Sequence, residues 1–479
     1  MTVQDLRPLL PLLVLSASIL TVMLVTAFKR SHRLVFSLSL LGLMLSLASV
    51  FFATDGLPRA ITPVLLVDTF GIFYMALVLV TSLVVVVLSF DYVENMTGNG
   101  EEYYLLVLLA SLGALVLVIS NHFVSFFLGL ETLGISLYTL IAYTRFERRR
   151  IEAGIKYLVL AAAASSFLLF GMALVYLVFG TMQFDQIGDA SGLPAVENRL
   201  RTLGLSMIMV GIGFKLALVP FHMWAPDVYQ GAPAPVTAFV ATVSKAGIFA
   251  LLLRLFASAP LLPGGDLWNI IALIAILSML VGNLLAVVQT NVKRILAYSS
   301  IAHFGYLLVA FLAGNSLSAP SMTFYLVVYI VTTLMSFGVI AVLSRPEKEF
   351  EELDDYRGLI HTHRTHAVFM SLALFSLASL PPTGGLVGKI FLAAAGVGSS
   401  LWLLLSALVI GSVIGVFYYL RIVITILRQP MEGARRWIAP GAGITANATL
   451  AALGIALLVT GVFPSPLINL IESLSIAFR

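Results

Sequence analysis

The sequence predicts an all-α polytopic membrane protein with about fourteen transmembrane helices and two inverted five-helix repeats, each with a broken helix. Three observations lead to this fold class. Of the 479 residues, 60% are hydrophobic and only 10% are charged, whereas soluble domains contain about 45–50% apolar and about 25% charged residues. Apolar runs of membrane-spanning length follow one another along most of the chain. Two of the later runs are interrupted by clusters of proline and glycine.

The apolar runs are long enough to cross a bilayer, because a hydrocarbon core of about 30 Å needs about 20 helical residues. Polar residues, glycine or proline bound the runs, which predict helices at residues 8–28, 31–53, 61–90, 103–120, 122–143, 155–179, 203–222, 228–257, 267–289, 293–313, 321–344, 366–397, 401–428 and 440–463. The first run has neither a basic segment before it nor a small-residue cleavage site after it. It is therefore interpreted as an anchor rather than a signal peptide.

The distribution of lysine and arginine predicts the orientation, because these residues favour cytoplasmic loops. One set of alternate loops holds sixteen of them: Lys29, Arg30, Arg33, Arg145, Arg148, Arg149, Arg150, Lys293, Arg294, Arg345, Lys348, Arg357, Arg364, Arg428, Arg435 and Arg436. The other set, which includes the termini, holds five: Arg7, Arg59, Arg199, Arg201 and Arg479. With an even number of spans, this asymmetry predicts that both termini lie outside.

The composition also restricts the chemistry. The chain has no cysteine, which excludes thiolate-ligated iron–sulfur and zinc sites within it. Any electron transfer must therefore take place in another subunit. The net charge of +4 does not indicate nucleic-acid binding, because the basic residues lie at helix ends or singly inside apolar runs instead of forming a stripe.

Charged residues inside the apolar runs are the candidate functional residues. Glu131, Lys215, Lys245 and Lys389 each lie within a predicted span. A charge at the bilayer centre costs a few kcal/mol or more, so such residues normally face a protein interior or a wet cavity and are functional by default. Structural ion pairing is the alternative for Glu131, and a purely structural role is the alternative for Lys215 and Lys245. Lys156, near the inner end of its span, could extend to the membrane surface instead.

Three further charged features are interpreted as structural. Arg254 follows Lys245 by nine residues, which places it on the opposite helix face near the outer end, and its side chain is expected to extend to the surface. Asp68 is expected to form an ion pair or a helix cap. The acidic segment at 347–356 is expected to be a solvated face or a docking surface.

The interrupted spans are the second informative feature. Pro220 opens the stretch PFHMWAPDVYQGAPAP, and Pro381 and Pro382 lie in SLASLPPTGGLVGKIF. Proline removes a backbone donor, and broken helices at membrane depth occur only inside protein or beside a cavity, where they mark ion sites in transporters. Lys215 precedes its break, where the helix dipole and the carbonyl groups freed by the break favour an ammonium ion, whereas Lys389 follows its break, where the dipole disfavours one. A lysine under such opposed influences can switch protonation, which a proton relay requires.

The order of a polar residue followed by a lysine on a broken helix occurs twice. Glu131 lies 84 residues before Lys215, and His303 lies 86 residues before Lys389, so the offset between the two sets is 172–174 positions. This offset spans five helices, and an odd number makes the second unit inverted. The predicted division is 1–98 for three N-terminal helices, 99–258 and 259–430 for the two repeats, and 431–479 for a C-terminal helix. His303 could pass a proton between the units, or it could be a neutral, hydrogen-bonded helix-packing histidine.

Several long motifs resemble the antiporter-like subunits of respiratory complex I, and they cover essentially the whole chain. They are FLGLETLGISLY, IEAGIKYLVLAAAASSFLLFGMALVY, GFKLALVPFHMWAPDVYQGAPAP, ATVSKAGIF, QTNVKRILAYSSIAHFGYLLVA and the Lys389 segment. The QGAPAP form of the first break, the lysine in the twelfth span and the lack of a long C-terminal lateral helix are similar to one of these subunit types in particular.

The resemblance implies a proton-translocating subunit in the membrane arm of a bacterial inner-membrane NADH:quinone oxidoreductase, with both termini periplasmic. It implies that Glu131 and Lys215 form a paired switch, that Lys245 is the central relay and that Lys389 is the second relay or exit group. Lys156 and His303 are expected to support the path.

The resemblance also implies the surroundings of the chain. FMN, iron–sulfur clusters and quinone are expected in partner subunits, with no cofactor in this chain. The expected partners are subunits M and K as neighbours, subunits L, A, J and H, the peripheral arm and membrane lipids, with no nucleic acid. A subunit of a multisubunit sodium/proton antiporter is the main alternative. A stand-alone exporter would need titratable groups gathered around one solute cavity, and a structural scaffold would leave the buried charges unexplained.

Overall fold

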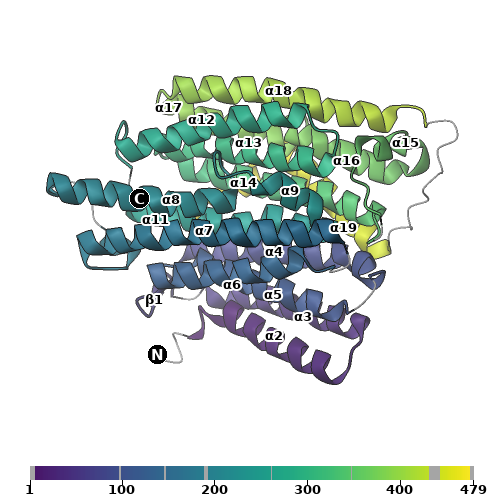
Figure 1. Cartoon of the computed structure of the whole chain (residues 1–479), viewed down its shortest axis with the longest axis horizontal. Coiled ribbons are helices and arrows are strands. Elements are labelled where there is room, and N and C mark those ends of the chain that lie inside the picture. Colours follow the sequence, from purple (N-terminus) through teal and green to yellow (C-terminus); the bar gives the residue numbers. More distant parts are fainter. Residues whose placement is uncertain are drawn as a thin grey trace.

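The fold is a bundle of long helices that lie side by side, with α2 and α3 along one side of the view and α18 along the other (Figure 1). The computed structural model describes residues 6–54, 56–96, 99–144, 147–187, 192–259, 261–346, 348–430 and 443–474. Four of the arginines counted for the orientation, Arg145, Arg435, Arg436 and Arg479, lie outside these residues. The predicted all-α membrane fold is confirmed.

The helices correspond closely to the predicted spans. They are α2 (Leu10–Phe28), α3 (His32–Val50), α4 (Thr69–Glu94), α5 (Glu101–Val118), α6 (Phe123–Ile141), α7 (Arg148–Phe179), α8 (Ala195–Leu216), α9 (Trp224–Gly231), α10 (Ala234–Phe239), α11 (Lys245–Ser258), α12 (Asp266–Val287), α13 (Val292–Ala313), α14 (Ser318–Leu343), α15 (Leu359–Thr362), α16 (Arg364–Leu377), α17 (Gly384–Gly398), α18 (Trp402–Leu427), α19 (Ile444–Val462) and α20 (Ser465–Leu474). Short 3₁₀ turns lie at η1 (Phe51–Ala53), η2 (Phe184–Gln186) and η4 (Leu353–Tyr356), and η3 (Val240–Ser244) is a π-helix that joins α10 to α11.

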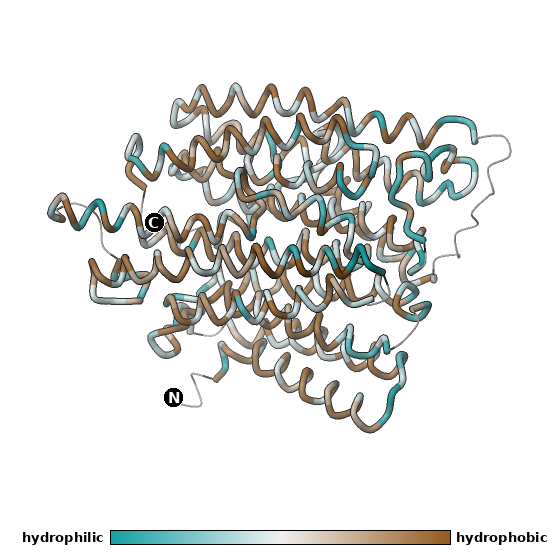
Figure 2. The backbone as a smooth tube through the Cα atoms, viewed as in Figure 1, coloured by the Kyte–Doolittle hydropathy of each residue, from teal (hydrophilic) through white to brown (hydrophobic). Residues whose placement is uncertain are grey.

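Twelve helical segments in the described part of the chain are long and apolar enough to cross a membrane. Apolar residues cover most of the helix lengths, and hydrophilic residues gather mainly near the ends (Figure 2). The twelve do not include α8, nor the shorter helices α16 and α17 on either side of the second break. The amphipathic helix α20 was not predicted, because its ten residues are too short for a span.

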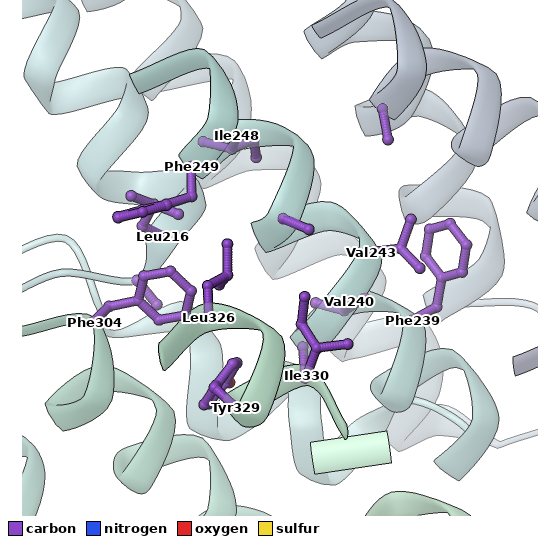
Figure 3. Packing of buried hydrophobic residues seen from close by; sticks show 14 of the residues in the cluster. Leu216, Phe239, Val240, Val243, Ile248, Phe249, Phe304, Leu326, Tyr329 and Ile330 are labelled. Carbon is purple, nitrogen blue, oxygen red and sulfur yellow. The ribbon is translucent and has the colours of Figure 1, made fainter. Parts of the chain in front are cut away.

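Three spans form the centre of the bundle: the continuous segment α10–η3–α11, α13 and α14. Their most apolar windows are 100%, 89% and 89% buried inside the protein, against 28% for α2. Figure 3 shows side chains from these elements meeting, including Val240, Ile248, Phe249, Phe304, Leu326 and Tyr329. Most polar groups on these three spans are therefore enclosed by protein.

One predicted helix begins later than its apolar run. Residues 61–68 were assigned to the third span, but β1 (Arg59–Ile61) and β2 (Leu65–Val67) form an antiparallel hairpin there. The run is apolar enough for a span, but Pro63 has no amide donor to give to a helix. Asp68 then begins α4, because its carboxylate accepts a hydrogen bond from the Gly71 amide at 2.7 Å.

A backbone pairing occurs twice along the chain. An isolated antiparallel bridge joins His122 to Gln183, and another joins Asn291 to Glu352. In both pairs the first residue is the N-cap of a helix, α6 or α13, and accepts a hydrogen bond from a backbone amide of its first turn. The second pair follows the first by 169 positions at both residues.

The two helix breaks also share one local geometry. Ala217 and Ser379 have positive φ angles of 61° and 57°, a conformation that is rare for residues other than glycine and clusters at functional sites. The following amides, of Leu218 and Leu380, each donate to a carbonyl five residues back, at 2.8 and 2.9 Å. Each break also contains a cis X–Pro peptide, at Pro220 and at Pro382. These features repeat at an offset of 162 positions.

The backbone offsets of 162 and 169 differ from the side-chain offset of 172–174 that the sequence suggested. The position 162 residues before Lys389 is occupied by Asp227, and the position 169 residues before Ser300 is occupied by Glu131. Lys215 and Lys389 therefore do not occupy corresponding positions, because one lies before its break and the other lies after it.

Candidate functional site

Lys215 lies in the last turn of α8, next to the first break. Its side chain is buried, and in the described part of the chain its Nζ atom has no hydrogen-bond partner. It faces the rings of Tyr138 and Tyr157, with Nζ 5.6 and 5.3 Å from their centroids. A Cβ atom placed at Gly134 would lie only 3.2 Å from Nζ, so this glycine leaves room for the amine. An ammonium ion without a hydrogen-bond partner costs free energy in such a site.

The described residues of the helix break next to Lys215 provide no hydrogen-bond acceptor for its amine. The sequence suggested that carbonyl groups freed by the break would stabilise the ammonium ion. Instead, the Phe214 carbonyl accepts a hydrogen bond from Trp224 Nε1 at 2.8 Å and from the Ala217 amide at 3.0 Å. The Val219 amide donates to Ser278 Oγ at 3.0 Å. The groups at the break are thus bonded to one another or to α12.

Glu131 lies near Lys215 but does not form a close ion pair with it. Its Oε1 atom accepts a hydrogen bond from Ser165 Oγ on α7 at 2.9 Å, and its side chain is partly exposed. The carboxylate is still close enough for its charge to act on Lys215. The structure therefore brings the two residues of the predicted switch together and leaves a gap between them that water can fill.

Lys245 lies at the centre of the bundle, at the first residue of α11. It is fully buried, and its Nζ atom donates to Ser300 Oγ at 2.6 Å. Ser300 Oγ is also bonded to the Tyr329 hydroxyl at 2.6 Å. Lys245 Nζ also lies 4.6 Å from the centroid of the Phe304 ring. The π-helix η3 ends directly before Lys245, and such π segments are frequent at functional sites.

His303 continues the chain of polar groups on α13, one turn beyond Ser300. Its Nδ1 atom is bonded to the Tyr325 hydroxyl at 2.6 Å and its Nε2 atom to the Tyr419 hydroxyl at 3.1 Å. Tyr419 is in turn bonded to Ser299. Both ring nitrogens therefore have partners, an arrangement that suits a proton relay as well as a histidine that only packs between helices.

Lys389 lies in the second turn of α17, after the second break. Its Nζ atom lies 4.7 Å from the centroid of the Tyr306 ring. The Tyr306 hydroxyl accepts a hydrogen bond from Asn283 Nδ2 at 2.8 Å, and Asn283 Oδ1 accepts one from Tyr418 at 3.0 Å. The charges of Lys389 and Lys245 both act on His303. Both lysines therefore lie near His303: Lys389 faces the Tyr306 ring, whose centroid is 5.6 Å from that of the His303 ring, and Lys245 is bonded to Ser300, one turn before His303.

Lys156 lies away from this network. Its side chain is 45% exposed and forms ion pairs with Glu152 and Asp227, both at 2.9 Å. Asp227 also binds Arg294 at 2.8 Å. Lys156 therefore belongs to an exposed cluster of charges that connects α7, α9 and α13, and it does not reach the other predicted residues.

The hydroxyl groups of the network were missed in the sequence. Serine and tyrosine are common in buried helices, and only their side-chain partners reveal a connected path. One available signal was the spacing of Tyr325 and Tyr329, which places both on one face of α14. Together, amines, hydroxyls and an imidazole connect α11, α13, α14 and α18. Such a chain can pass protons by exchanging hydrogen bonds, with water in the gaps.

Arg254 does not extend to the membrane surface, so that expectation was wrong. It is buried and forms a two-pronged ion pair with Asp68, with Nη atoms 2.8 and 3.0 Å from the carboxylate oxygens. Its Nε atom donates to the Val118 carbonyl at 3.1 Å. The carboxylate that begins α4 therefore also binds α11. Asp68 was expected to form an ion pair or a helix cap, and it forms both.

We expect Arg254→Met to reduce the stability of the assembled protein, because it leaves the Asp68 carboxylate buried without its cation. Removing one member of a buried ion pair costs about 3–5 kcal/mol. The midpoint of thermal unfolding in mild detergent measures this effect. The matched control is Asp68→Asn combined with Arg254→Met, which removes both charges and should recover part of the loss. An unchanged midpoint in the single variant would contradict the expectation.

The acidic segment after α14 is also different from its expected form. Glu349 is buried, and its carboxylate binds Lys293 at 2.6 Å, with Arg150 at 3.9 Å. Burial by itself would raise the pKa of Glu349, but the nearby charges of Lys293 and Arg150 outweigh it and hold the pKa below its usual value. The segment is therefore only in part a solvated face. Among the described residues, no three His, Asp or Glu side chains form a group that could hold a metal ion.

Known proteins resemble the chain over nearly its whole length. A family model described as NADH:quinone oxidoreductase/Mrp antiporter, TM, matches residues 120–415. A protein of Ectopseudomonas mendocina named NADH-quinone oxidoreductase subunit N is 47% identical over 98% of this chain and 97% of its own length. A protein of the same name from Methylococcus capsulatus is also 47% identical, over 98% of this chain and 95% of its own length. One chain in the structure of respiratory complex I from Thermus thermophilus with bound aureothin superimposes with a TM-score of 0.83 and 33% identity, covering 96% of this chain and 98% of that one.

Proposed function

Because the chain belongs to the family of transmembrane proteins shared by NADH:quinone oxidoreductases and Mrp antiporters, we propose that it moves protons across the membrane as a subunit of an NADH:quinone oxidoreductase. The observation that carries this function is the 47% identity, over nearly the whole chain, to two proteins named subunit N of that enzyme. NADH oxidation and quinone reduction are assigned to other subunits, which agrees with a chain that has no cysteine.

The proposed proton path follows the buried network. Lys215 holds a proton whose release is controlled by the charge of Glu131, and Lys245 receives it at the centre of the bundle. Ser300 and His303 then connect Lys245 toward Lys389, which passes the proton on. Hydrogen bonds from Lys245 to Ser300 and from His303 to two tyrosines support this order. Water is required between Lys215 and Lys245 and beside Lys389.

The proposed topology has fourteen spans and two inverted repeats. Adding the broken segments α8–α9 and α16–α17 to the twelve apolar helices gives fourteen. The bridges repeated at 169 positions and the break geometry repeated at 162 positions support two related units. The units are residues 99–258 and 259–430, preceded by 1–98 and followed by 431–479. Five spans per unit make the second unit inverted.

The proposed partners come from the enzyme in which the named relatives take part. Subunits M and K would be the neighbours within the membrane arm, with L, A, J, H and the peripheral arm completing the complex. FMN, iron–sulfur clusters and quinone would be bound by those partners. The exposed apolar faces of the outer helices, such as Leu403, Val413 and Phe417 on α18, suit contact with lipid or another membrane subunit.

Purification from the native membrane under mild detergent tests the function. We expect flavin and iron–sulfur subunits to accompany the chain, and the preparation to reduce quinone with NADH while acidifying one side of a vesicle. Purification with cofactor-free membrane subunits alone, together with sodium-dependent proton exchange, would favour the antiporter. That alternative rests on the part of the family description that names Mrp antiporters.

Both termini are proposed to lie on the periplasmic side of a bacterial inner membrane, and this predicts a labelling pattern. Because the chain has no cysteine, single cysteines report accessibility without background. In intact cells with a permeable outer membrane, Leu262→Cys should react with a membrane-impermeant maleimide, whereas Lys29→Cys should react only after the inner membrane is opened. Both residues are exposed and lie in loops between helices. The reverse pattern would overturn the orientation.

A further inference from the structure

A polar cavity of about 310 Å³ lies beside the segment that follows α14. It is lined by five carboxylates and three cations: Glu147, Glu349, Glu351, Glu352, Asp355, Arg149, Arg150 and Lys348. At roughly 30 Å³ for each molecule, this volume holds several waters. An excess of negative charge around a wet cavity concentrates protons there.

We propose that this cavity and the buried Glu349–Lys293 pair at its base form the route by which protons reach Lys245 from the inner aqueous side. The inference rests on the proposed function and adds a second supply to it, because Lys245 then receives protons from the inner side as well as from Lys215. The proton carriers of this route are Glu349 and Lys293. They are not among the residues of the path proposed above, which are Glu131, Lys215, Lys245 and Lys389.

The ion pair extends from the cavity wall into the helical interior. Lys293 is fully buried, and its Nζ atom donates to Glu349 Oε2 and to the Ala232 carbonyl, both at 2.6 Å. The other carboxylate oxygen accepts from the Tyr92 hydroxyl at 2.6 Å and from the Ala234 amide at 3.1 Å. One carboxylate thus lines the cavity and contacts helices α4, α10 and α13.

Helix α13 leads from this pair to the central lysine. Lys293 and Ser300 are seven residues apart and so lie on one face of the helix, about 10 Å from each other along its axis. Ser300 accepts the hydrogen bond from Lys245. Tyr229 lies beside the interval between Lys293 and Lys245. Its ring centroid is 5.8 Å from Lys245 Nζ. Ala232, whose carbonyl accepts from Lys293, follows Tyr229 by three residues. The Tyr229 hydroxyl and a few waters can complete the path.

The transfer is balanced in protons. An N–H bond of the Lys293 ammonium breaks and a new N–H bond forms on the neutral amine of Lys245. Cavity water then returns a proton to Lys293 through the Glu349 carboxylate. The groups that face this carboxylate are Lys293, Arg150 and Tyr92, and the two cations keep it ionised between transfers.

Glu349→Gln in the intact complex, reconstituted in vesicles with the inner side facing the medium, tests the route. Glutamine keeps an acceptor oxygen for Lys293 but cannot carry a proton. We expect coupled turnover at pH 8 to fall about fivefold or more, since a positioned proton carrier contributes about 100-fold or more. We expect the loss to shrink as the medium is acidified to pH 6, and to be partly reversed by a small diffusible weak acid. Glu94→Gln, which alters an exposed pair with Arg33, is the matched control and should behave as wild type.

Lys293→Arg separates proton transfer from a structural role. Arginine keeps the positive charge beside Glu349 but does not release its proton. Full turnover in Lys293→Arg, or a Glu349→Gln loss that neither low pH nor a weak acid reverses, would make the pair structural and overturn the route. Lys245→Met distinguishes this failure from failure of the proposed function. If Lys245→Met is inactive while Glu349→Gln is normal, only the route is wrong; if both are fully coupled, the proposed function is wrong as well.

Discussion

Lys215→Met is expected to leave the complex assembled and to lower coupled turnover by roughly tenfold or more, because a positioned proton donor or acceptor contributes about 100-fold or more. The structure explains why assembly should survive. Lys215 Nζ has no hydrogen-bond partner in the described part of the chain, so its removal leaves no group unpaired. Methionine is unbranched and fills the same space without a charge to bury. NADH-driven acidification and subunit content, measured on one preparation, check both parts.

Two comparisons make this result specific for proton transfer. Lys215→Arg retains a cation but cannot release its proton at physiological pH, so it should be as inactive as the methionine variant. Lys29→Met, at an exposed loop position, controls for the substitution itself and should be fully active. Normal turnover and normal proton stoichiometry in Lys215→Met would show that this lysine is not a relay.

Lys389→Met is expected to have a similarly large effect for a different local reason. Its amine faces the Tyr306 ring, which packs beside His303, and Lys389 is the last titratable group of the proposed path. Removing it should interrupt the path after the central relay. We expect coupled turnover to fall about tenfold or more, as measured by quinone reduction together with vesicle acidification.

Lys156→Met is the informative comparison for Lys389→Met. Lys156 lies in an exposed cluster with Glu152 and Asp227, and exposed ion pairs contribute only about 0–1 kcal/mol. This variant should therefore lose little turnover. Equal losses at Lys156 and Lys389 would indicate that each substitution acts through stability and not through proton transfer.

Much of the fold was predictable, since hydropathy located nearly every membrane helix, and clusters of proline and glycine located both breaks. The buried lysines were predictable for the same reason, because charge inside an apolar run is costly and thus conspicuous. The partners that a side chain contacts in the folded structure could not be predicted. Arg254 was placed near the surface because its helix position is close to the outer end, but Asp68 lies 186 residues earlier in sequence and no local pattern connects the two.

The offset of 172–174 positions came from side chains, and the backbone features that recur along the chain do not follow it, for a physical reason. The sequence offers only side chains for comparison, and the lysines give an offset that the backbone does not follow. Backbone bridges and break geometry depend on hydrogen bonds between segments far apart, such as Asn291 and Glu352. The hydroxyl partners of His303 were equally invisible, because tyrosine in an apolar helix usually serves only to pack.

The unequal positions of Lys215 and Lys389 have an electrical consequence. In the proposed topology the seventh and twelfth spans cross the membrane in opposite directions, so a lysine before the first break and a lysine after the second both lie on the outward side of their breaks. A proton moving between them then travels mainly parallel to the membrane plane. Work against the membrane potential is about 2.3 kcal/mol per charge for each 100 mV crossed, and a lateral step crosses almost none of it. The voltage therefore acts mainly on uptake and release, and the transfers between the lysines proceed at nearly constant potential.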